Sequence, residues 1–318
     1  MKVAVIGSRG FIGRAVCSVL ADSGHSVRSV PSFRVEGTEA RVGAVQEAGK
    51  TWIAAHPRIV ARLVATLDGA DVLVNAAGMA APSSNDLSAL MDANAVLPIV
   101  VAEMASRAGV PRMIHVSSGS VQGRKNPLDE TLDFNPFSPY TDSKVAGERA
   151  LALRDWTSST DVIIYRPTSV QAPDRPITRK LVHVAARRLV LLPGRGDSPI
   201  PVCLIENVGR AIQHLVAMDP APRIVLQPWE GMTTRRLFEA FNANARFLRL
   251  PSALVNLGLG FTLTVGRHNL QFQALARRME LLSKGQGQDA LALERAGFAV
   301  GDCFSAYRAM STLIRCAG

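Results

Sequence analysis

Tyr140 and Lys144 are the residues whose types and spacing most directly suggest chemistry. They stand four positions apart, so in a helix their side chains face the same way. Residues 145–151 read as helix, which would place the pair on its first turns. A phenol titrates near pH ~10 in water, and a lysine ammonium held close pulls that pKa towards neutrality. The pair could therefore act as a general acid/base on a hydroxyl or carbonyl oxygen, although the spacing alone is common by chance.

A glycine-rich turn follows the first strand-like run, residues 2–6. It reads Gly7-Ser8-Arg9-Gly10-Phe11-Ile12-Gly13 and leads into an amphipathic stretch that ends near Ser23-Gly24. In a strand–turn–helix context, such glycines permit a tight turn, an approach of the backbone to a pyrophosphate and packing of helix on strand. The N–H groups at the start of the helix then face the phosphates. The pattern predicts a bound dinucleotide.

The expected second strand, residues 26–30, bears on the choice between NAD and NADP. An NAD site usually has an Asp or Glu near the end of this strand to bind the adenosine ribose. Here the chain continues Pro31-Ser32-Phe33-Arg34, and Arg9 lies within the glycine turn. Two arginines and no carboxylate suit a 2′-phosphate. NADP(H) is favoured, and NAD(H) stays open.

Strands and helices alternate through the first half of the chain, which predicts an α/β fold with a doubly wound parallel sheet. Further strands are expected at residues 51–55, 71–75, 112–116 and 161–165, and helices at 58–67 and 86–109. Open α/β sheets bind ligands at the carboxyl ends of their strands. The segments placed there are Asn75-Ala76-Ala77-Gly78, Ser117-Ser118-Gly119-Ser120 and Arg166-Pro167-Thr168.

The pattern changes after about residue 172. A basic helix is expected at 178–190, an extended segment at 199–203, a helix at 206–218 and a strand at 223–226, with mostly helical sequence from 228. We assign residues 1–172 to a dinucleotide-binding domain to which 204–227 return. Residues 173–203 and 228–318 then form a smaller, mostly helical substrate lobe.

Composition narrows the classes of partner. The formal net charge is +10 and the pI about 10.1, but only 5% of residues are aromatic and no basic run is interleaved with aromatics. Anionic small molecules are therefore expected rather than nucleic acid. The four cysteines show no Cys-x-x-Cys spacing, so neither a disulfide framework nor a metal site is expected.

Two features bear on location. A strand-like run begins directly after Met1 and leaves no room for a signal peptide, so we expect a cytoplasmic protein. The apolar run 250–265 contains Pro251, Gly258 and Gly260 and falls short of the ~20 residues that a membrane span needs. Flanked by Arg246, Arg249 and Arg267, it could touch a membrane surface, but a buried helix of the small lobe is the favoured interpretation.

Together these motifs resemble the extended short-chain dehydrogenase/reductase family, and most of all its nucleotide-sugar epimerase/dehydratase/reductase branch. The segments Arg166-Pro167-Thr168-Ser169-Val170 and Pro201–Val208 support the resemblance, which covers residues 1 to about 230. It implies that Tyr140 is the acid/base and that Lys144 holds the nicotinamide ribose. Counting back from Gly123 makes Ser118 the residue that hydrogen-bonds the reacting oxygen, with Ser117 as backbone support and Asn94 as a structural residue.

The resemblance and the positions of the basic residues together predict two sets of binding residues. The cofactor set is Gly7, Arg9, Gly10, Phe11, Ile12, Gly13, Ser32, Arg34, Asn75, Ala76, Ala77, Gly78, Tyr140, Lys144 and Pro167. The substrate set is Ser118, Ser120, Arg179 and Arg195, with Lys180, Arg187 and Arg188 as further candidates for a diphosphate. Dimerisation through the helix after Tyr140 is a family expectation, and residues 143–153 carry Val145, Ala146, Ala150, Leu151 and Leu153.

The chain departs from the family pattern in three places. It has Val121-Gln122-Gly123 where many members have Val-Tyr-Gly, and no clear Asp to hold adenine. Dehydratases place Asp-Glu directly after the catalytic residue, whereas Gly119-Ser120 follow Ser118 here. The absence of that acid pair argues against 4,6-dehydration.

The favoured function is a 4-ketoreductase acting on a nucleotide sugar. The alternatives are an NAD-dependent nucleotide-sugar 4-epimerase, a reductase of a non-sugar carbonyl such as a steroid or flavonoid ketone, and a non-catalytic dinucleotide-sensing or scaffold protein. Such sensors commonly lose the Tyr–Lys pair that this chain retains.

Overall fold

The computed structural model describes residues 1–316 apart from residues 32, 42, 82–83, 154–159, 221, 252–253, 256 and 258–269. The chain divides into two compact units. The first consists of residues 1–123, 130–167 and 208–226, and the second of residues 124–129, 168–207 and 227–318. Each unit has its own hydrophobic core.

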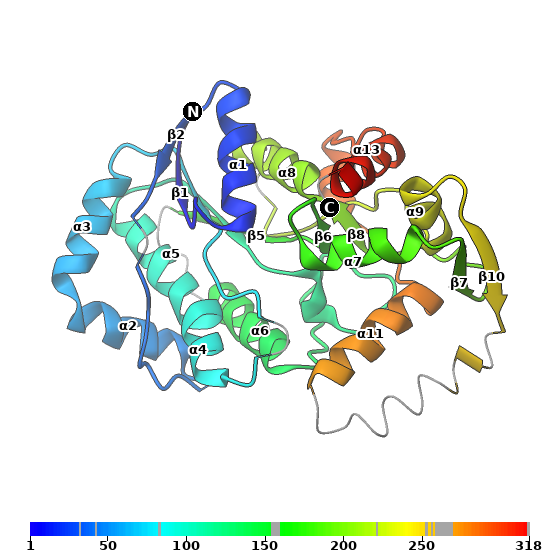
Figure 1. The fold of residues 1–318 in the computed structure, drawn as a ribbon. Helices are drawn as coiled ribbons and strands as arrows, with labels where there is room; N and C mark the ends of the chain where they lie inside the picture. The colour runs from blue at the N-terminus through cyan, green and yellow to red at the C-terminus, as the bar shows by residue number, and fades with distance from the viewer. Residues whose placement is uncertain are drawn as a thin grey trace. The chain divides into compact units, whose positions relative to one another are not determined.

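A six-stranded parallel sheet forms the centre of the first unit, with the strand order β2-β1-β3-β4-β5-β9 (Figure 1). Short apolar runs buried on both faces are typical of such strands. After β2 the chain crosses to the other side of β1, which makes the edge between β1 and β3 a switch point where ligands bind. The strands are β1 (Lys2–Ile6), β2 (Ser26–Ser29), β3 (Val72–Asn75), β4 (Arg112–Val116), β5 (Asp161–Arg166) and β9 (Ile224–Leu226).

Helices pack around this sheet in two groups. Gly209 brings α8 against α1, because a β-carbon there would stand 3.2 Å from the carbonyl oxygen of Ala15. The other group consists of α2, α3, α6 and the turn η1, each of which packs against α5 (Figure 1). The helices are α1 (Phe11–Asp22), α2 (Val45–Ala55), α3 (Pro57–Leu67), α4 (Leu87–Met91), the π-helical turn η1 (Asp92–Val96), α5 (Leu97–Arg107), the 3-10 turn η2 (Gly119–Gln122), α6 (Pro139–Ala152) and α8 (Ile205–Ala217).

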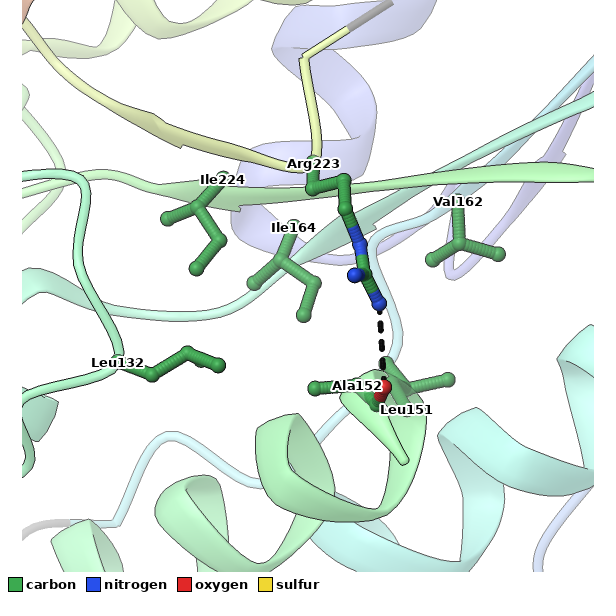
Figure 2. A pocket seen from close by; sticks show the side chains of 7 residues that line it. All are labelled: Leu132, Leu151, Ala152, Val162, Ile164, Arg223 and Ile224. Carbon is green, nitrogen blue, oxygen red and sulfur yellow. Dashed lines mark hydrogen bonds between the residues drawn. The ribbon is translucent and has the colours of Figure 1, made fainter. Parts of the chain in front are cut away.

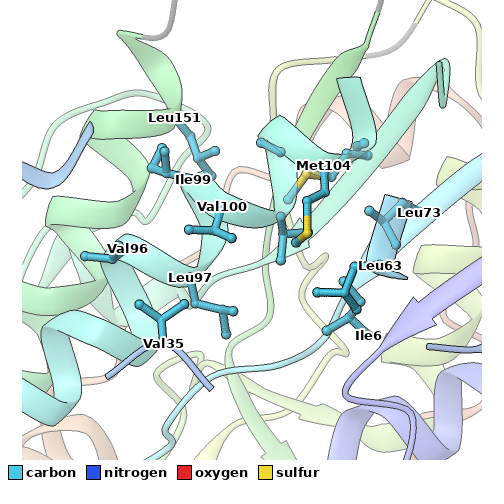
Figure 3. Close-up of a cluster of buried hydrophobic side chains, with 14 of the residues drawn as sticks. Ile6, Val35, Leu63, Leu73, Val96, Leu97, Ile99, Val100, Met104 and Leu151 are labelled. Carbon is cyan, nitrogen blue, oxygen red and sulfur yellow. The ribbon is translucent and has the colours of Figure 1, made fainter. Parts of the chain in front are cut away.

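Helix α5 is the centre of the first core. Figure 3 shows its residues Leu97, Val100 and Met104 between the sheet residues Ile6 and Leu73 and the surrounding helices. The stretch Leu87–Arg107 is long and apolar enough to cross a membrane by length and composition. An 18-residue window within it has a mean hydropathy of 1.5, but 72% of this window is buried within the chain. Its apolar character is explained by its place in the core.

The prediction of a strand at residues 51–55 was wrong, because these residues belong to α2. Val45, Gly49, Trp52 and Ile53 recur at helical spacing and form the buried face of α2. Gly49 packs so closely on α5 that a β-carbon would stand 2.9 Å from Cγ2 of Ile99.

The second unit combines helices with small parallel sheets, β6 with β8 and β7 with β10. The basic helix expected at 178–190 ends at Ala185, and Leu189–Pro193 form β7 instead; β10 was not predicted. The elements are β6 (Ser169–Gln171), α7 (Pro176–Ala185), β7 (Leu189–Pro193), β8 (Val202–Leu204), α9 (Thr234–Phe241), β10 (Arg246–Leu250), α11 (Leu270–Lys284), α12 (Leu291–Arg295) and α13 (Cys303–Cys316).

The apolar run 250–265 lies mostly outside the described residues. Leu254 and Leu257, which are described, are exposed rather than buried. The expectation of a buried helix is wrong for these two leucines.

Candidate active site

A capping box fixes the start of α6. The hydroxyl of Ser138 accepts from the N–H of Thr141 at 3.3 Å, and the hydroxyl of Thr141 accepts from the N–H of Ser138 at 2.9 Å. Pro139 occupies the first turn, where its missing N–H costs nothing. These residues set Tyr140 in the first turn and Lys144 one turn later. Tyr140 is half-buried.

The ammonium of Lys144 is buried and donates a 3.4 Å hydrogen bond to the carbonyl oxygen of Val116 at the end of β4. Burial lowers the pKa of Lys144 to about 8, and the carboxylate of Glu148 partly opposes that shift. The side chain therefore stays largely protonated at neutral pH and supplies a positive charge one helical turn from Tyr140.

The loop after β3 is joined to α6 through Asn94 on the π-helical turn. The amide nitrogen of Asn94 donates to the carbonyl of Met79 and to the hydroxyl of Ser143, each at 3.1 Å, and its oxygen accepts from the N–H of Met79 at 2.9 Å. Gly147 lets α6 approach this turn, because a β-carbon there would stand 2.3 Å from the carbonyl oxygen of Asn94. Asn94 thus has the structural role that the resemblance implied, and Gly147 is a residue that sequence reasoning missed.

A buried ion pair holds the other side of α6. The guanidinium of Arg166 donates to the carboxylate of Glu148 at 2.6 Å, and neither side chain is exposed to solvent. Ser117 donates its hydroxyl to the same carboxylate, and Arg166 also donates to the carbonyl of Thr131 at 2.7 Å. The ends of β4 and β5 are thereby joined to α6. Ser117 is a support residue, as expected.

Ser118 precedes the 3-10 turn η2 and caps it. Its hydroxyl lies 2.8 Å from that of Ser120 and accepts the N–H of Ser120 at 3.2 Å. Because α6 packs against η2, the turn and the Tyr140 helix belong to one assembly. Gln122 is buried, and its amide donates to the carbonyl of Thr131 at 3.4 Å, so this departure from the family pattern serves the fold.

The glycine turn after β1 has the geometry that the motif requires. Gly7 has φ +78°, and a β-carbon there would stand 2.6 Å from the nitrogen of Ala77; one on Gly13 would stand 2.0 Å from the carbonyl oxygen of Gly7. Gly10, the N-cap of α1, has no side chain to cap the helix, and the first turn has no acidic residue. This end of α1 fits the phosphates of a dinucleotide.

Asn75 and His115 connect β3 and β4 below that turn. The amide nitrogen of Asn75 donates to Nδ1 of His115 at 3.2 Å, and its oxygen accepts the N–H of Ala77 at 3.1 Å. Burial, with the charge of Lys144 as a lesser cause, holds the pKa of His115 well below its ordinary value. A neutral His115 can accept this bond, which orients Asn75 and the loop that follows. Sequence reasoning did not single out His115.

A scan against protein-family models matches residues 3–226 to the NAD dependent epimerase/dehydratase family. The chain belongs to that family. It is therefore an enzyme of the extended short-chain dehydrogenase/reductase type with an NAD(P) cofactor, which removes the non-catalytic alternative.

Two curated relatives represent two activities within the family. A 2-alkyl-3-oxoalkanoate reductase of Stenotrophomonas maltophilia is 28% identical over 69% of this chain and 66% of its own length. A UDP-glucose 4-epimerase of Mycolicibacterium smegmatis is 29% identical over 61% of this chain and 64% of its own length. The chain thus spans just under two thirds of the length of each relative.

Solved structures share the fold at low identity. A UDP-glucuronic acid 4-epimerase of Bacillus cereus in complex with NAD gives a TM-score of 0.62 at 17% identity, covering 99% of this chain and 100% of that one. Human epimerase family protein SDR39U1 with NADPH gives a TM-score of 0.64 at 16% identity, covering 98% and 99%. Both nicotinamide cofactors therefore occur on this fold.

The remaining residues of the predicted sets fall into two groups. In the first unit, Arg9 is exposed in the glycine turn, Arg34 pairs with Glu36 at 3.5 Å on the surface, and the carbonyl of Pro167 accepts from Gly119 at 2.9 Å. Ser32 lies outside the described residues. In the second unit, Arg179 donates to the carbonyl of Pro173 at 2.9 Å and Arg195 pairs with Asp197 at 3.3 Å, both exposed.

The apolar side chains expected to form a dimer contact are used within the chain. Val145, Ala146, Ala150 and Leu151 are buried, α2 packs on α6, and Leu153 is exposed. The homodimer stays a prediction without the exposed apolar face on which it was based.

A cavity of about 80 Å³ opens near the other end of α6. It is lined by Leu132, Leu151, Ala152, Val162, Ile164, Arg223 and Ile224, and Figure 2 shows Arg223 donating to the carbonyl of Ala152. Leu151 stands eleven residues after Tyr140, about 17 Å along the helix, so this cavity is separate from the candidate active site.

Proposed function

We propose that this enzyme is an NADP(H)-dependent reductase of the 4-keto group of a nucleotide-activated sugar. The observation that carries the proposal is the placement of Tyr140 and buried Lys144 on the first two turns of a capped helix that packs against the Ser118 turn. The same residues would also serve the reverse reaction, the oxidation of the corresponding alcohol.

The chain's own residues have defined tasks in this proposal. Tyr140 passes its phenolic proton to the oxygen of the carbonyl that is reduced. The ammonium of Lys144 favours the phenolate that remains, because an opposite charge nearby stabilises the ionised form. Ser118 donates a hydrogen bond to the same oxygen, and Ser120 holds the Ser118 hydroxyl in position at 2.8 Å.

The cofactor supplies the hydride, and the residues of the first unit would bind and orient it. Gly7 and Gly13 allow the tight turn and its close packing, and Gly10 would let the pyrophosphate approach the uncapped start of α1. The segment after β3 lies beside the glycine turn and would contact the bound cofactor; it consists of Asn75, Ala76, Ala77 and Gly78. Arg9, exposed in the turn, would bind the 2′-phosphate of NADP(H), and no acidic residue follows β2 before Glu36.

The substrate class is supported by the family and by charge. The epimerase relative and the Bacillus cereus structure are both named for UDP-sugars. A net charge of +10 suits an anionic substrate. Arg179 and Arg195 of the second unit are the proposed contacts of the diphosphate.

An NAD-dependent 4-epimerase is the alternative that uses the same residues, and it would hold its cofactor through the cycle. The missing carboxylate after β2 argues against it.

A second candidate is reduction of a 3-oxo group in a more lipophilic substrate. The relative named as a 2-alkyl-3-oxoalkanoate reductase matches 69% of this chain, against 61% for the epimerase relative.

One set of measurements separates these functions. The freshly purified enzyme is denatured and the released nucleotide is identified, and NADPH consumption is then followed with nucleotide 4-keto-sugars and with 2-alkyl-3-oxo acids. Turnover of a keto-sugar by enzyme that releases no tightly held NAD supports the proposal. Stoichiometric oxidised NAD would establish the epimerase instead, and turnover only of the oxo acids would establish the second candidate.

A further inference from the structure

The two-stranded sheet of the second unit has an apolar face that points away from its core. In the parallel register Leu191 pairs with Leu248, and Leu189 pairs with Arg246, so these four side chains lie on one face. Leu189, Leu191 and Leu248 are 52%, 55% and 49% exposed. The alternate residues Val190, Leu192 and Phe247 pack into the core of this unit. Figure 1 shows β7 and β10 side by side.

Single exposed leucines are ordinary, but several on one small face are not. The chain adds to them soon after β10, where Leu254 and Leu257 are 59% and 73% exposed. Exposing apolar side chains to water is unfavourable, and burying them against another surface is favourable. The leucines on this face therefore indicate a contact surface. We call Leu189, Leu191 and Leu248 the leucine face.

The sequence around β7 and β10 is rich in basic residues. Residues 175–196 contain six Lys or Arg and no Asp or Glu, and residues 240–279 contain five Arg and again no acid. Arg187 and Arg188 directly precede β7, and Arg246 lies in β10 on the same face as the leucines; all three are exposed. Within the described part of the chain, no carboxylate forms an ion pair with any of these three arginines.

We propose that the leucine face, together with Arg187, Arg188 and Arg246, binds the surface of an anionic phospholipid bilayer. Leucines at the acyl boundary and arginines among the lipid phosphates are the pattern of a protein that lies on a membrane. The strands have five residues each, so the contact is with the surface and does not span the bilayer.

Charge also argues against the two other occupants. A second copy of the chain in a two-fold contact would bring the same arginines against one another without acids to pair with them. A purely apolar protein partner would leave the arginines unused. An anionic bilayer satisfies both the leucines and the arginines.

The experiment is sedimentation of the full-length enzyme with vesicles of phosphatidylcholine alone or mixed with phosphatidylglycerol. We expect at least about tenfold stronger partition onto the anionic vesicles at low ionic strength, and a large loss of binding at high salt. Equal binding to both kinds of vesicle, or none to either, would overturn the proposal.

Two sets of variants locate the contact. The triple variant Leu189→Ser, Leu191→Ser, Leu248→Ser should lose most of the partition, whereas Leu313→Ser, which changes a leucine 61% exposed on α13, should not. Replacing Arg187 and Arg188 by Ala should weaken binding about fivefold for each arginine. The matched control is Arg58→Ala with Arg62→Ala, at two exposed arginines of α3.

Folding and assembly are measured on the same samples. Thermal unfolding and NADPH binding should be unchanged in the leucine variant, since its side chains face outward. If that variant sediments with vesicles like the wild type, or if it loses only self-association in analytical ultracentrifugation, the face is not a lipid surface.

Discussion

The ammonium nitrogen of Lys144 lies 3.3 Å from the point where a β-carbon on Gly78 would stand. The same point is 2.9 Å from the side-chain oxygen of Asn94, and Gly78 has φ +155°. Three segments therefore meet at Gly78: the loop after β3, the π-helical turn and α6. The space beside the ammonium of Lys144 exists because Gly78 has no side chain.

Gly78→Ala should consequently impair activity more than stability. The added methyl group would displace Lys144 or Asn94, and a shift of about 1 Å in a catalytic group can cost on the order of a hundredfold in rate. Kinetics and thermal unfolding are compared with Gly69→Ala, where φ is +66° and nothing lies within 4 Å of the new atom. Equal losses of rate in the two variants would show that the methyl group at position 78 does not act by displacing Lys144 or Asn94.

Tyr140→Phe tests the proton transfer. Loss of a general acid typically lowers kcat by about a hundredfold or more, while NADPH affinity should stay within about twofold because the ring remains. The measurements are steady-state turnover and NADPH titration. Tyr307→Phe, at a buried tyrosine of the second unit, is the control for the loss of a phenolic hydroxyl group. A Tyr140→Phe enzyme with normal turnover would rule out the assigned role.

The buried ammonium of Lys144 should make stability depend on pH. Its folded-state pKa of about 8 lies below the unfolded value near ~10.4, so between these values the unfolded chain binds more protons. The free energy of unfolding therefore rises with pH across this window, by up to about 3 kcal/mol from this group. Urea unfolding at several pH values should show the rise in the wild type and its absence in Lys144→Met. Lys50→Met, at an exposed lysine of α2, should retain it, and a pH-independent difference between wild type and Lys144→Met would contradict the desolvation.

Glu148→Gln should destabilise the first unit strongly. It leaves the guanidinium of Arg166 buried without its counter-charge, a change that costs about 3–5 kcal/mol. Combining Glu148→Leu with Arg166→Met should recover much of the loss, because no unpaired charge remains. Chemical unfolding measures both, with Glu103→Gln of the surface pair with Arg107 as a control expected below about 1 kcal/mol. A loss no larger than that of the control would mean that Arg166 is not dependent on Glu148.

Arg9→Ala should reveal the cofactor preference. Losing a charged contact to the 2′-phosphate should weaken NADPH about tenfold or more and leave NADH almost unchanged. Fluorescence titration of both cofactors checks this, with Arg62→Ala on α3 as the control. Equal weakening of NADPH and NADH would remove the argument for NADP(H).

Sequence patterns predicted those parts of the fold whose signals are local. The strand at 2–6, the glycine turn, the helix from 58 to 67 and the strand at 112–116 are found as β1, the turn, α3 and β4. Residues 51–55 were mispredicted as a strand because Thr51, Trp52 and Ile53 have side chains that favour strands locally. The close packing of Gly49 on α5 favours the helix instead, and this contact is not visible in the sequence. Strand β10 depends on pairing with β7, more than fifty residues earlier, which no local pattern records.

The site shows the same division. Tyr140, Lys144 and Ser118 follow from motifs, and their support does not. His115 reads as an ordinary strand residue until Asn75 is seen beside it. Gly147 reads as a weak point of a helix until the approach of Asn94 explains it. Such supporting residues are defined by neighbours that are distant in sequence.

Helix α2 gives the enzyme an internal brace. It packs on α5 and α6, closely enough that Gly49 cannot carry a side chain without moving Ile99, and Gln46 donates to the carbonyl of Ala150 at 3.0 Å. The helix that bears Tyr140 and Lys144 is thereby held from within its own chain. Each molecule carries its own support for catalysis, so turnover per molecule should persist on dilution to concentrations at which assemblies of chains come apart.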